Sequence, residues 1–391
     1  MAATDTPTDM APGDTAAGDT TASNDVVSGD APDGGLDVAP GSTPQKLSMT
    51  IIVTDQIGGD GGLEVAPSDA GAGDADGGVD GGEAGVTTPS VDPNLVNPWG
   101  LAINPTGPIW VADNHTGLST VYNAAGQVMS LVVTVPVGDG GTAPSAPTGL
   151  VFNATTGFQG DHFVFSTEDG TVSGWQSGTA ALLRVDNTSA SSVYKGLALM
   201  TQNAVSRIYA TDFHNGKVDV FDQSYAKITA AGGFTDATLP AGFAPFGIQA
   251  IGSTIYVTYA KQDDMKMDDM AGAGNGYVDA FDFDGHLTKR VISQGALNSP
   301  WAVALAPADF GAFSGALLVG NFGDGHIGAY NASTGVFLGA ALTTTGAPLA
   351  IEGLWALVFG NDTAGAAHNR LFFTAGPHDE SHGLLGHLDL P

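Results

Sequence analysis

Cysteine is absent from this 391-residue chain, so disulfides and thiol chemistry are excluded. Basic side chains are scarce: 11 Lys and Arg face 41 Asp and Glu, which gives a formal net charge of −30 at pH 7. Such a surface repels the phosphates of nucleic acids, so we expect no nucleic acid partner. The sequence also has no run of about 18 apolar residues, so we expect no transmembrane segment.

Glycine, by contrast, is abundant at 57 residues, and short branched or aromatic runs alternate with polar turns. This pattern favours an all-β fold. The clearest unit is Ile208–Asp222, I-Y-A-T-D-F-H-N-G-K-V-D-V-F-D, in which two short runs suited to strands flank a tight loop that closes on Gly216. Five further copies occur at Ile109–Asn123, Phe163–Gln176, Ile255–Asp282, Leu317–Asn331 and Leu371–Asp389.

A second element precedes each of these hairpins, as in N-P-W-G-L-A at 97–102 and A-P-F-G-I-Q at 244–249. Its third position is occupied in turn by Trp99, Thr148, Lys195, Phe246, Trp301 and Trp355, at separations of 49, 47, 51, 55 and 54 residues. This period fits a four-stranded propeller blade, and six copies predict a six-bladed β-propeller. The last copy lacks a fourth strand, so we expect the spare N-terminal run Leu47–Thr54 to close the ring.

The predicted organisation has four parts. Residues 1–45 form a disordered acidic tail, 46–57 the closing strand, 58–90 a Gly/Asp-rich insert and 91–391 the propeller. Asp74, Asp76, Asp80 and Glu83 in the insert are compatible with a Ca²⁺ loop. However, the order of an EF-hand is not met, so a solvated acidic linker is preferred.

The start of the chain has no basic segment followed by an apolar core, so no signal peptide is expected there. Acidic tethers rich in Thr, Asp and Pro often follow the processed end of bacterial surface lipoproteins. We therefore expect a secreted or cell-surface protein, extracellular or periplasmic, and a monomer.

Residues 91–104, 193–222 and 295–325 carry a resemblance to a known family. They resemble a secreted, uncharacterised β-propeller family catalogued among PEP-CTERM-associated conserved hypothetical proteins, which is distantly similar to NHL-repeat proteins. The resemblance implies a propeller fold and export. It implies no established activity and no catalytic residues.

In a propeller, the loops between the second and third strands of each blade emerge around the central channel, which is the usual place for a ligand. His115 and His214 occupy the same position in two such loops, and His378 and His382 lie in the corresponding loop of the sixth blade. Imidazoles from several blades would suit an open Zn²⁺ site, and Ca²⁺ is the other divalent metal we consider. A propeller lyase of the NHL-like group binds metal in this way. The alternative is that these side chains bond backbone groups of their own turns.

Large side chains are expected on the same face, at or beside the first strand of four of the blades. Trp99, Phe246, Trp301 and Trp355, with Glu352, are candidate ligand-binding residues, but such rings also wedge adjacent blades together. Lys195 places a charge in this aromatic series, where it would pair with Glu352 or hold an anionic substrate group.

The insert Lys261–Gly276 interleaves Met265, Met267 and Met270 with aspartates. Thioethers select Cu(I) and carboxylates select hard ions, so a copper or calcium loop is one interpretation. An acidic flap over the channel mouth is the other, and it is preferred.

No G-x-S-x-G, H-E-x-x-H, P-loop or dinucleotide motif is present, which disfavours those chemistries. Two functions remain. One is a binding propeller that takes a small-molecule, glycan or protein ligand at the channel face. The other is a metal-dependent lyase or hydrolase, with Asp212, Glu380 or Lys195 as the acid or base. Whether the protein is an enzyme stays open at this stage.

Overall fold

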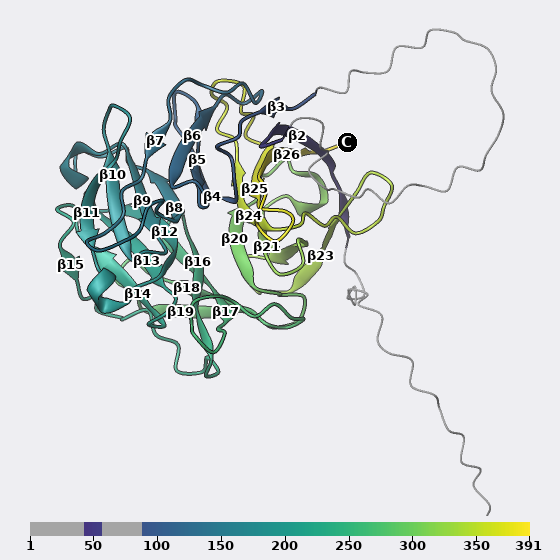
Figure 1. Ribbon diagram of the computed structural model, residues 1–391. Coiled ribbons are helices and arrows are strands. Elements are labelled where there is room, and N and C mark those ends of the chain that lie inside the picture. Colours follow the sequence, from purple (N-terminus) through teal and green to yellow (C-terminus); the bar gives the residue numbers. More distant parts are fainter. Residues whose placement is uncertain (1–42, 57–87) are drawn as a thin grey trace, which may run out of the picture. The chain divides into compact units, whose positions relative to one another are not determined.

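The computed structural model describes residues 43–56 and 88–391. All of them fall within one compact unit that spans Val38–Pro391. This part of the chain is all-β, with three short 3-10 turns at Phe158–Gly160, Thr188–Ala190 and Gly311–Phe313 (Figure 1). It contains no helix that is both long and apolar enough to cross a membrane. Nearly all of the predicted disordered tail and of the predicted insert lies outside the described residues.

The first three blades are regular four-stranded sheets in chain order (Figure 1). Blade one contains β4 (Pro98–Ile103), β5 (Ile109–Asp113), β6 (Leu118–Tyr122) and β7 (Val133–Thr134). Blade two contains β8 (Pro147–Phe152), β9 (Phe163–Thr167), β10 (Thr171–Trp175) and β11 (Leu182–Asp186). Blade three contains β12 (Tyr194–Gln202), β13 (Val205–Asp212), β14 (Lys217–Phe221) and β15 (Lys227–Ile228).

The other three blades follow the same antiparallel plan, and blades five and six each gain N-terminal strands. Blade four contains β16 (Phe243–Ile251), β17 (Thr254–Lys261), β18 (Tyr277–Phe281) and β19 (Leu287–Ser293). Blade five contains β20 (Pro300–Leu305), β21 (Ala316–Asn321), β22 (Ile327–Asn331) and β23 (Phe337–Leu342). Blade six contains β24 (Leu354–Phe359), β25 (Leu371–Ala375) and β26 (Leu384–Asp389). The predicted six-bladed propeller is therefore confirmed.

The inner strands β4, β8, β12, β16, β20 and β24 form a ring in which each contacts the next and β24 contacts β4. The recurring glycine of the first-strand motif lies where two of these strands approach closely. A Cβ on Gly149 would lie 2.3 Å from the backbone nitrogen of Leu197, and one on Gly247 would lie 1.9 Å from the carbonyl oxygen of Trp301. The glycine is thus required by the contact between blades.

Threonine side chains on the inner strand β8 and on the second strand β13 donate across the gap to the inner strand of the next blade. Thr148 Oγ1 donates to the carbonyl of Tyr194 and Thr211 Oγ1 to that of Phe246, both at 2.7 Å. Hydrophobic clusters fill the rest of the space between blades. The ring is therefore both packed and hydrogen-bonded around its axis.

The N-terminal strand closes the ring, as predicted. β2 (Ser48–Thr54) pairs antiparallel with β26, with Thr50 opposite His387 and Val53 opposite Leu385. The short β3 (Ser90–Val91) then pairs parallel with β2. The outer side of the last blade is thereby covered by a segment from the other end of the chain.

One pairing was not expected from the sequence. β1 (Gln45–Lys46) pairs parallel with the outer strand β23, so the chain also covers the outer edge of blade five. The pairing involves two residues, and Gln45 also accepts the backbone N–H of Ala312 at 2.6 Å. Gln45 therefore belongs to the folded part, which begins before residue 46.

Candidate functional site

A cavity of about 540 Å³ lies on the channel face that the sequence predicted as the ligand side. It is lined by inner-strand residues, by loops between the second and third strands of several blades, and by the insert of blade four. The lining residues are Trp99, Asn114, His115, Glu168, Lys195, Met267, Asp268, Asp269, Phe322, Trp355 and Glu380. Charged and aromatic side chains from six blades thus converge on one space.

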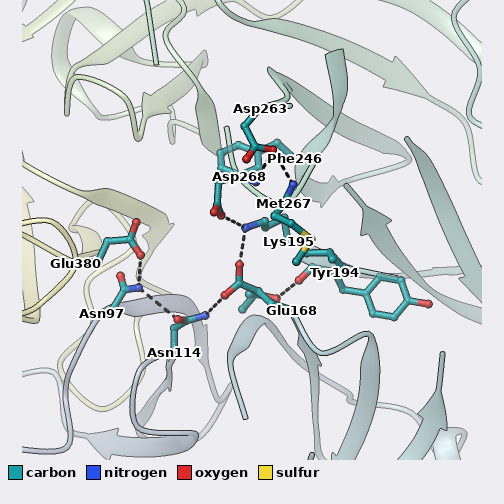
Figure 2. Close-up of polar contacts among 12 residues, drawn as sticks. Asn97, Asn114, Glu168, Tyr194, Lys195, Phe246, Asp263, Met267, Asp268 and Glu380 are labelled. Atoms are coloured by element: carbon teal, nitrogen blue, oxygen red, sulfur yellow. Dashed lines mark hydrogen bonds and ion pairs between the residues drawn. The ribbon is translucent and has the colours of Figure 1, made fainter. Parts of the chain in front are cut away.

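Lys195, on β12, is the buried cation of this cavity, with 2% of its surface exposed. Its Nζ donates to Glu168, from the loop after β9, and to Asp268 Oδ1 of the insert at 3.0 Å (Figure 2). The ammonium also lies 5.3 Å from the centre of the Trp99 ring. Burial by itself would lower the pKa of Lys195, but the charges of Glu168 and Asp268 outweigh it, so its pKa is raised and the group is charged.

The proposed pairing of Lys195 with Glu352 is wrong. Glu352 is exposed, and its carboxylate accepts the backbone N–H of His378 at 2.9 Å. Lys195 instead uses a carboxylate from the neighbouring second blade, which the packing of blades brings beside it. This packing between blades is invisible in the local sequence.

Two asparagines connect Glu168 to Glu380 (Figure 2). Asn114 Nδ2 donates to Glu168 Oε2 at 2.9 Å, and Asn97 Nδ2 donates to Asn114 Oδ1 at 3.4 Å and to Glu380 Oε2 at 2.5 Å. Trp355 Nε1 completes the chain by donating to Asn97 Oδ1 at 2.9 Å. The positions of both carboxylates are thus fixed by amides from blade one.

Asn97 was not among the candidate site residues. It stands directly before β4 and has a φ of 48°. Its place in the N-P-W-G-L-A element was visible, but nothing local indicated that its amide turns toward the channel.

Glu380 is one of two carboxyl groups of the cavity whose pKa is raised by burial. Burial, with the charge of Glu168 adding to it, raises the pKa of Glu380 to about 7. His115 Nε2 lies 4.0 Å from Glu380 Oε2. Asp269, on the insert, has a pKa that is likewise raised by burial.

The loop that holds Glu380 has an unusual backbone. His378, Asp379 and Glu380 have φ values of 56°, 51° and 63°, so three successive non-glycine residues are left-handed. Such conformations cost about 1 kcal/mol or more each, and they persist where the surroundings fix them. The chain thus accepts backbone strain in the loop that directs Glu380 to the cavity.

The aromatic set packs chiefly on itself. Trp99 and Phe322 stack on the Trp355 ring with centroid distances of 3.6 and 4.0 Å. Trp301 meets Trp355 edge-on at 5.9 Å and donates its Nε1 to the carbonyl of Lys195 at 2.9 Å. Phe246 is fully buried. Of the candidate ligand-binding residues, Trp99 and Trp355 line the cavity, and Phe246, Trp301 and Glu352 do not.

This aromatic cluster forms the inner limit of the site. Beyond it, the channel between the inner strands narrows to a space of about 30 Å³, lined by Gly149, Leu197, Trp301 and Ala356 among others. A space of this size holds about one water molecule. The cavity on the outer side of the rings, at about 540 Å³, is by contrast large enough for an organic ligand.

The four candidate metal-binding histidines lie in different surroundings. His115 lines the cavity, whereas His378 and His382 pack edge-on at 5.2 Å, and His382 Nδ1 bonds Asp55 Oδ2 at 2.9 Å. His214 has a buried Nδ1 with no partner in the described residues. Residues 43–56 and 88–391 contain no group of three or more His, Asp or Glu placed to hold a metal ion. The histidine-ligated site and the metal cofactor stay predictions.

Asp212, a candidate acid or base, serves its own loop. It is fully buried, accepts the backbone N–H of Asn215 in that loop at 3.3 Å and pairs with Lys217 at 3.0 Å. It does not line the cavity. Lys195 and Glu380, the other two candidates, both do.

The insert Lys261–Gly276 lies at the cavity, as the preferred interpretation predicted. Met267, Asp268 and Asp269 line it, and Asp268 ties the insert to Lys195. An isolated antiparallel β-bridge pairs Gln262 with Asp269 within the insert. We call residues 261–276 the flap.

Fold and site together define the class: this is a six-bladed β-propeller protein with a polar cavity on its channel face. No family model matches the chain. The chain is 33% identical over 318 residues to an uncharacterised protein of Acanthamoeba polyphaga mimivirus, covering 76% of each. It is 32% identical over 319 residues to a second one, covering 76% of this chain and 81% of the relative. The chain belongs to the family of these uncharacterised proteins.

Solved structures with a similar fold have varied activities. Virginiamycin B lyase from Staphylococcus aureus has 15% identity and a TM-score of 0.43, covering 76% of this chain and 98% of the lyase. The PQQ-bound aldose sugar dehydrogenase of Streptomyces coelicolor has 11% identity and a TM-score of 0.44, covering 75% of this chain and 95% of the enzyme. These similarities concern the fold alone. Association with PEP-CTERM sorting stays a prediction.

Proposed function

We propose that this protein is a binding propeller that holds a small ligand in the channel-face cavity. The observation that carries the proposal is the cavity itself, about 540 Å³ in volume and lined by charged, amide and aromatic side chains. Ligand sites of proteins are typically concave spaces of about 300–1,000 Å³ with a few converging polar groups. The flap beside the cavity favours a small molecule over a glycan chain or a protein.

The polar groups of the cavity are held in place before any ligand arrives. Lys195 is held between Glu168 and Asp268, and Asn97 and Asn114 link Glu168 to Glu380 (Figure 2). Side chains that are already ordered lose little entropy on binding. This arrangement suits recognition of a ligand by fixed polar contacts.

The proposal is tested by ligand-observed NMR with a library of small polar molecules. His115→Trp places a large ring at the cavity, on a side chain that is 44% exposed and therefore tolerant of change. His286→Trp is the matched control, because His286 lies in the β18–β19 turn of blade four, outside the lining. We expect compounds that bind the wild type and His286→Trp but not His115→Trp. Binding that survives His115→Trp, or no binding by the wild type, would contradict the proposal.

A second candidate function is acid–base catalysis at the same cavity. The observation that favours it is Glu380, because a carboxyl group with a pKa of about 7 can both give and take a proton near neutrality. A metal-dependent lyase or hydrolase is the more specific form of this proposal. It would be supported by stoichiometric metal in tag-free protein that is lost in His115→Ala and His214→Ala, and metal-free protein would count against it.

Export is a further part of the proposal, and it is supported by the acidic segment rich in Thr, Asp and Pro at residues 1–45 and by the family resemblance. Fractionation of source cells tests it: the chain should appear in the medium, at the cell surface or in the periplasm.

A further inference from the structure

The charge of the cavity identifies the class of ligand. Four carboxylates line it, from Glu168, Asp268, Asp269 and Glu380, against the single lysine Lys195. The whole chain, with these groups included, carries a formal net charge of −30. An anion would enter against this field, whereas a cation would be attracted by it.

Lys195 does not offer an anion site, because its charge is already used. Glu168 and Asp268 both accept from its Nζ, and 2% of the residue is exposed. An anionic ligand would have to displace one of these carboxylates and lie beside the others. The geometry therefore disfavours Lys195 as the recognition group.

Glu380 and Asp269 are the two carboxylates left for a ligand. Asp269 forms no ion pair within 4 Å in the described residues. The nearest basic group to Glu380 in that part of the chain is His115, at 4.0 Å. Burial raises the pKa of both groups, and the charges of Glu168 and Asp268 add to this effect, while Lys195 opposes it without cancelling it. A ligand cation would supply the missing compensation.

A second observation is independent of these charges. The indole Nε1 of Trp99 is buried and has no acceptor among the described residues, and Trp99 lines the cavity. A buried indole N–H is usually hydrogen-bonded, so an oxygen atom of a ligand would satisfy it.

We propose that the cavity takes a small organic cation, with an ammonium group bound by Glu380 and Asp269 and an oxygen atom that accepts from Trp99. This inference rests on the proposed binding function. The cavity volume of about 540 Å³ is that of an organic molecule and far exceeds that of a bare ion.

Three probes of equal chain length separate the classes: aminohexanol is a cation with a hydroxyl, hexanediol is neutral and hydroxyhexanoate is an anion. Each is titrated by ligand-observed NMR at a pH above 7, where Glu380 is ionised. The test variants are Glu380→Gln and Asp269→Asn. Asp379→Asn and Asp264→Asn are matched controls, because they remove the same charge from the same loop and the same flap outside the lining.

We expect aminohexanol to bind more tightly than the other two probes. Each test variant should weaken its binding about tenfold or more, and each control should leave it unchanged. In the wild type, binding should also weaken as the pH falls below about 7, because Glu380 becomes protonated. This pH dependence should be weaker in Glu380→Gln, in which Asp269 is the one carboxylate of the pair that still takes up a proton.

The possible failures are distinguishable. If hexanediol or hydroxyhexanoate binds as well as aminohexanol, and His115→Trp abolishes this binding, the cation class is wrong and the cavity still binds ligands. If aminohexanol binds and His115→Trp does not weaken it, both proposals fail. If no probe binds, or the test variants behave as their controls do, the cation proposal is overturned.

Discussion

At the scale of single residues, the site is governed by how the buried charges are compensated. Lys195 and Glu168 compensate each other across two blades, whereas Glu380 accepts an amide hydrogen bond from Asn97 and has no close cation apart from His115 among the described residues. A buried charge without a partner destabilises the folded state far more than a surface charge does. Removing the charge of Lys195 should therefore lower the stability of the protein, whereas removing the charge of Glu380 should raise it.

Lys195→Met should destabilise the protein. The change removes the cation from a side chain that is 2% exposed and leaves Glu168 without its partner. Breaking a buried pair in this way typically lowers the free energy of unfolding by about 3 kcal/mol. Urea unfolding of Lys195→Met and of Lys195→Met/Glu168→Gln measures it, and the double variant should recover part of the loss. Equal stability of the single variant and the wild type would show that the pair contributes nothing.

Glu380→Gln should change how stability depends on pH. Because the folded-state pKa is raised from 4.5 to about 7, the folded protein binds this proton more tightly than the unfolded chain does. The contribution of Glu380 to stability is therefore full below pH 4.5 and is lost as the pH rises through about 7. Relative to the wild type, Glu380→Gln should gain stability over this window.

Thermal unfolding at a series of pH values measures the effect, with Asp379→Asn as the control from the same loop. A stability difference between Glu380→Gln and the wild type that stays constant across the window would contradict the prediction.

The sequence indicated part of this chemistry. Lys195 stood out because it places a charge at a repeat position held by aromatic rings in four of the six blades. Its partners were beyond sequence reasoning, because Glu168 and Asp268 come from two other blades and approach Lys195 only through packing. Glu380 was among the candidates, whereas the Asn97 amide that holds it was not.

At the scale of the elements, the inner strands set the size of the ring. Gly100, Gly149, Gly196 and Gly247 hold equivalent positions in blades one to four, and Ala302 and Ala356 replace them in blades five and six. The repeat pattern identified this position, but it did not reveal that a neighbouring backbone occupies the space of the missing side chain. The glycines are therefore packing determinants of the contact between blades.

Gly247→Ala tests this interpretation. The added methyl group would lie 1.9 Å from the carbonyl oxygen of Trp301, so the two inner strands would have to separate. Overpacking of this kind lowers the free energy of unfolding by about 1–3 kcal/mol. Gly107→Ala is the control, because the nearest atoms to its added methyl belong to Asn104 at 3.7 Å. Equal urea midpoints for the two variants would mean that the ring tolerates the wider spacing.

At the scale of the propeller as a whole, the blade count and the closing strand followed from the sequence. Both are properties of a repeat, and they depend on spacing and on the need to cover an open edge. β1 did not follow, because a two-residue pairing with β23 depends on the path that the chain takes toward β2. Similarly, the sequence placed the flap at the channel face but did not show that Asp268 reaches Lys195.

Closure by β2 should be required for a stable ring, and two shortened chains test this. The reference chain begins at Thr43 and keeps β1 and β2, and the test chain begins at Asp55 and lacks both. The test chain loses Leu47, Ile52 and Val53, which are 1%, 7% and 0% exposed. At about 2 kcal/mol for each buried side chain, it should lose roughly 6 kcal/mol of stability.

The loss also uncovers β26, whose hydrogen-bonding edge pairs with β2 along Ser48–Thr54 in the intact chain. A bare strand edge recruits other strands, so the test chain should self-associate in size-exclusion chromatography, whereas the reference chain should not. A peptide of residues 45–56 added in trans should restore both the elution position and the urea midpoint, because it supplies the same backbone partners and apolar side chains. If the test chain stays monomeric with an unchanged midpoint, blade six is stable with three strands and β2 only covers it.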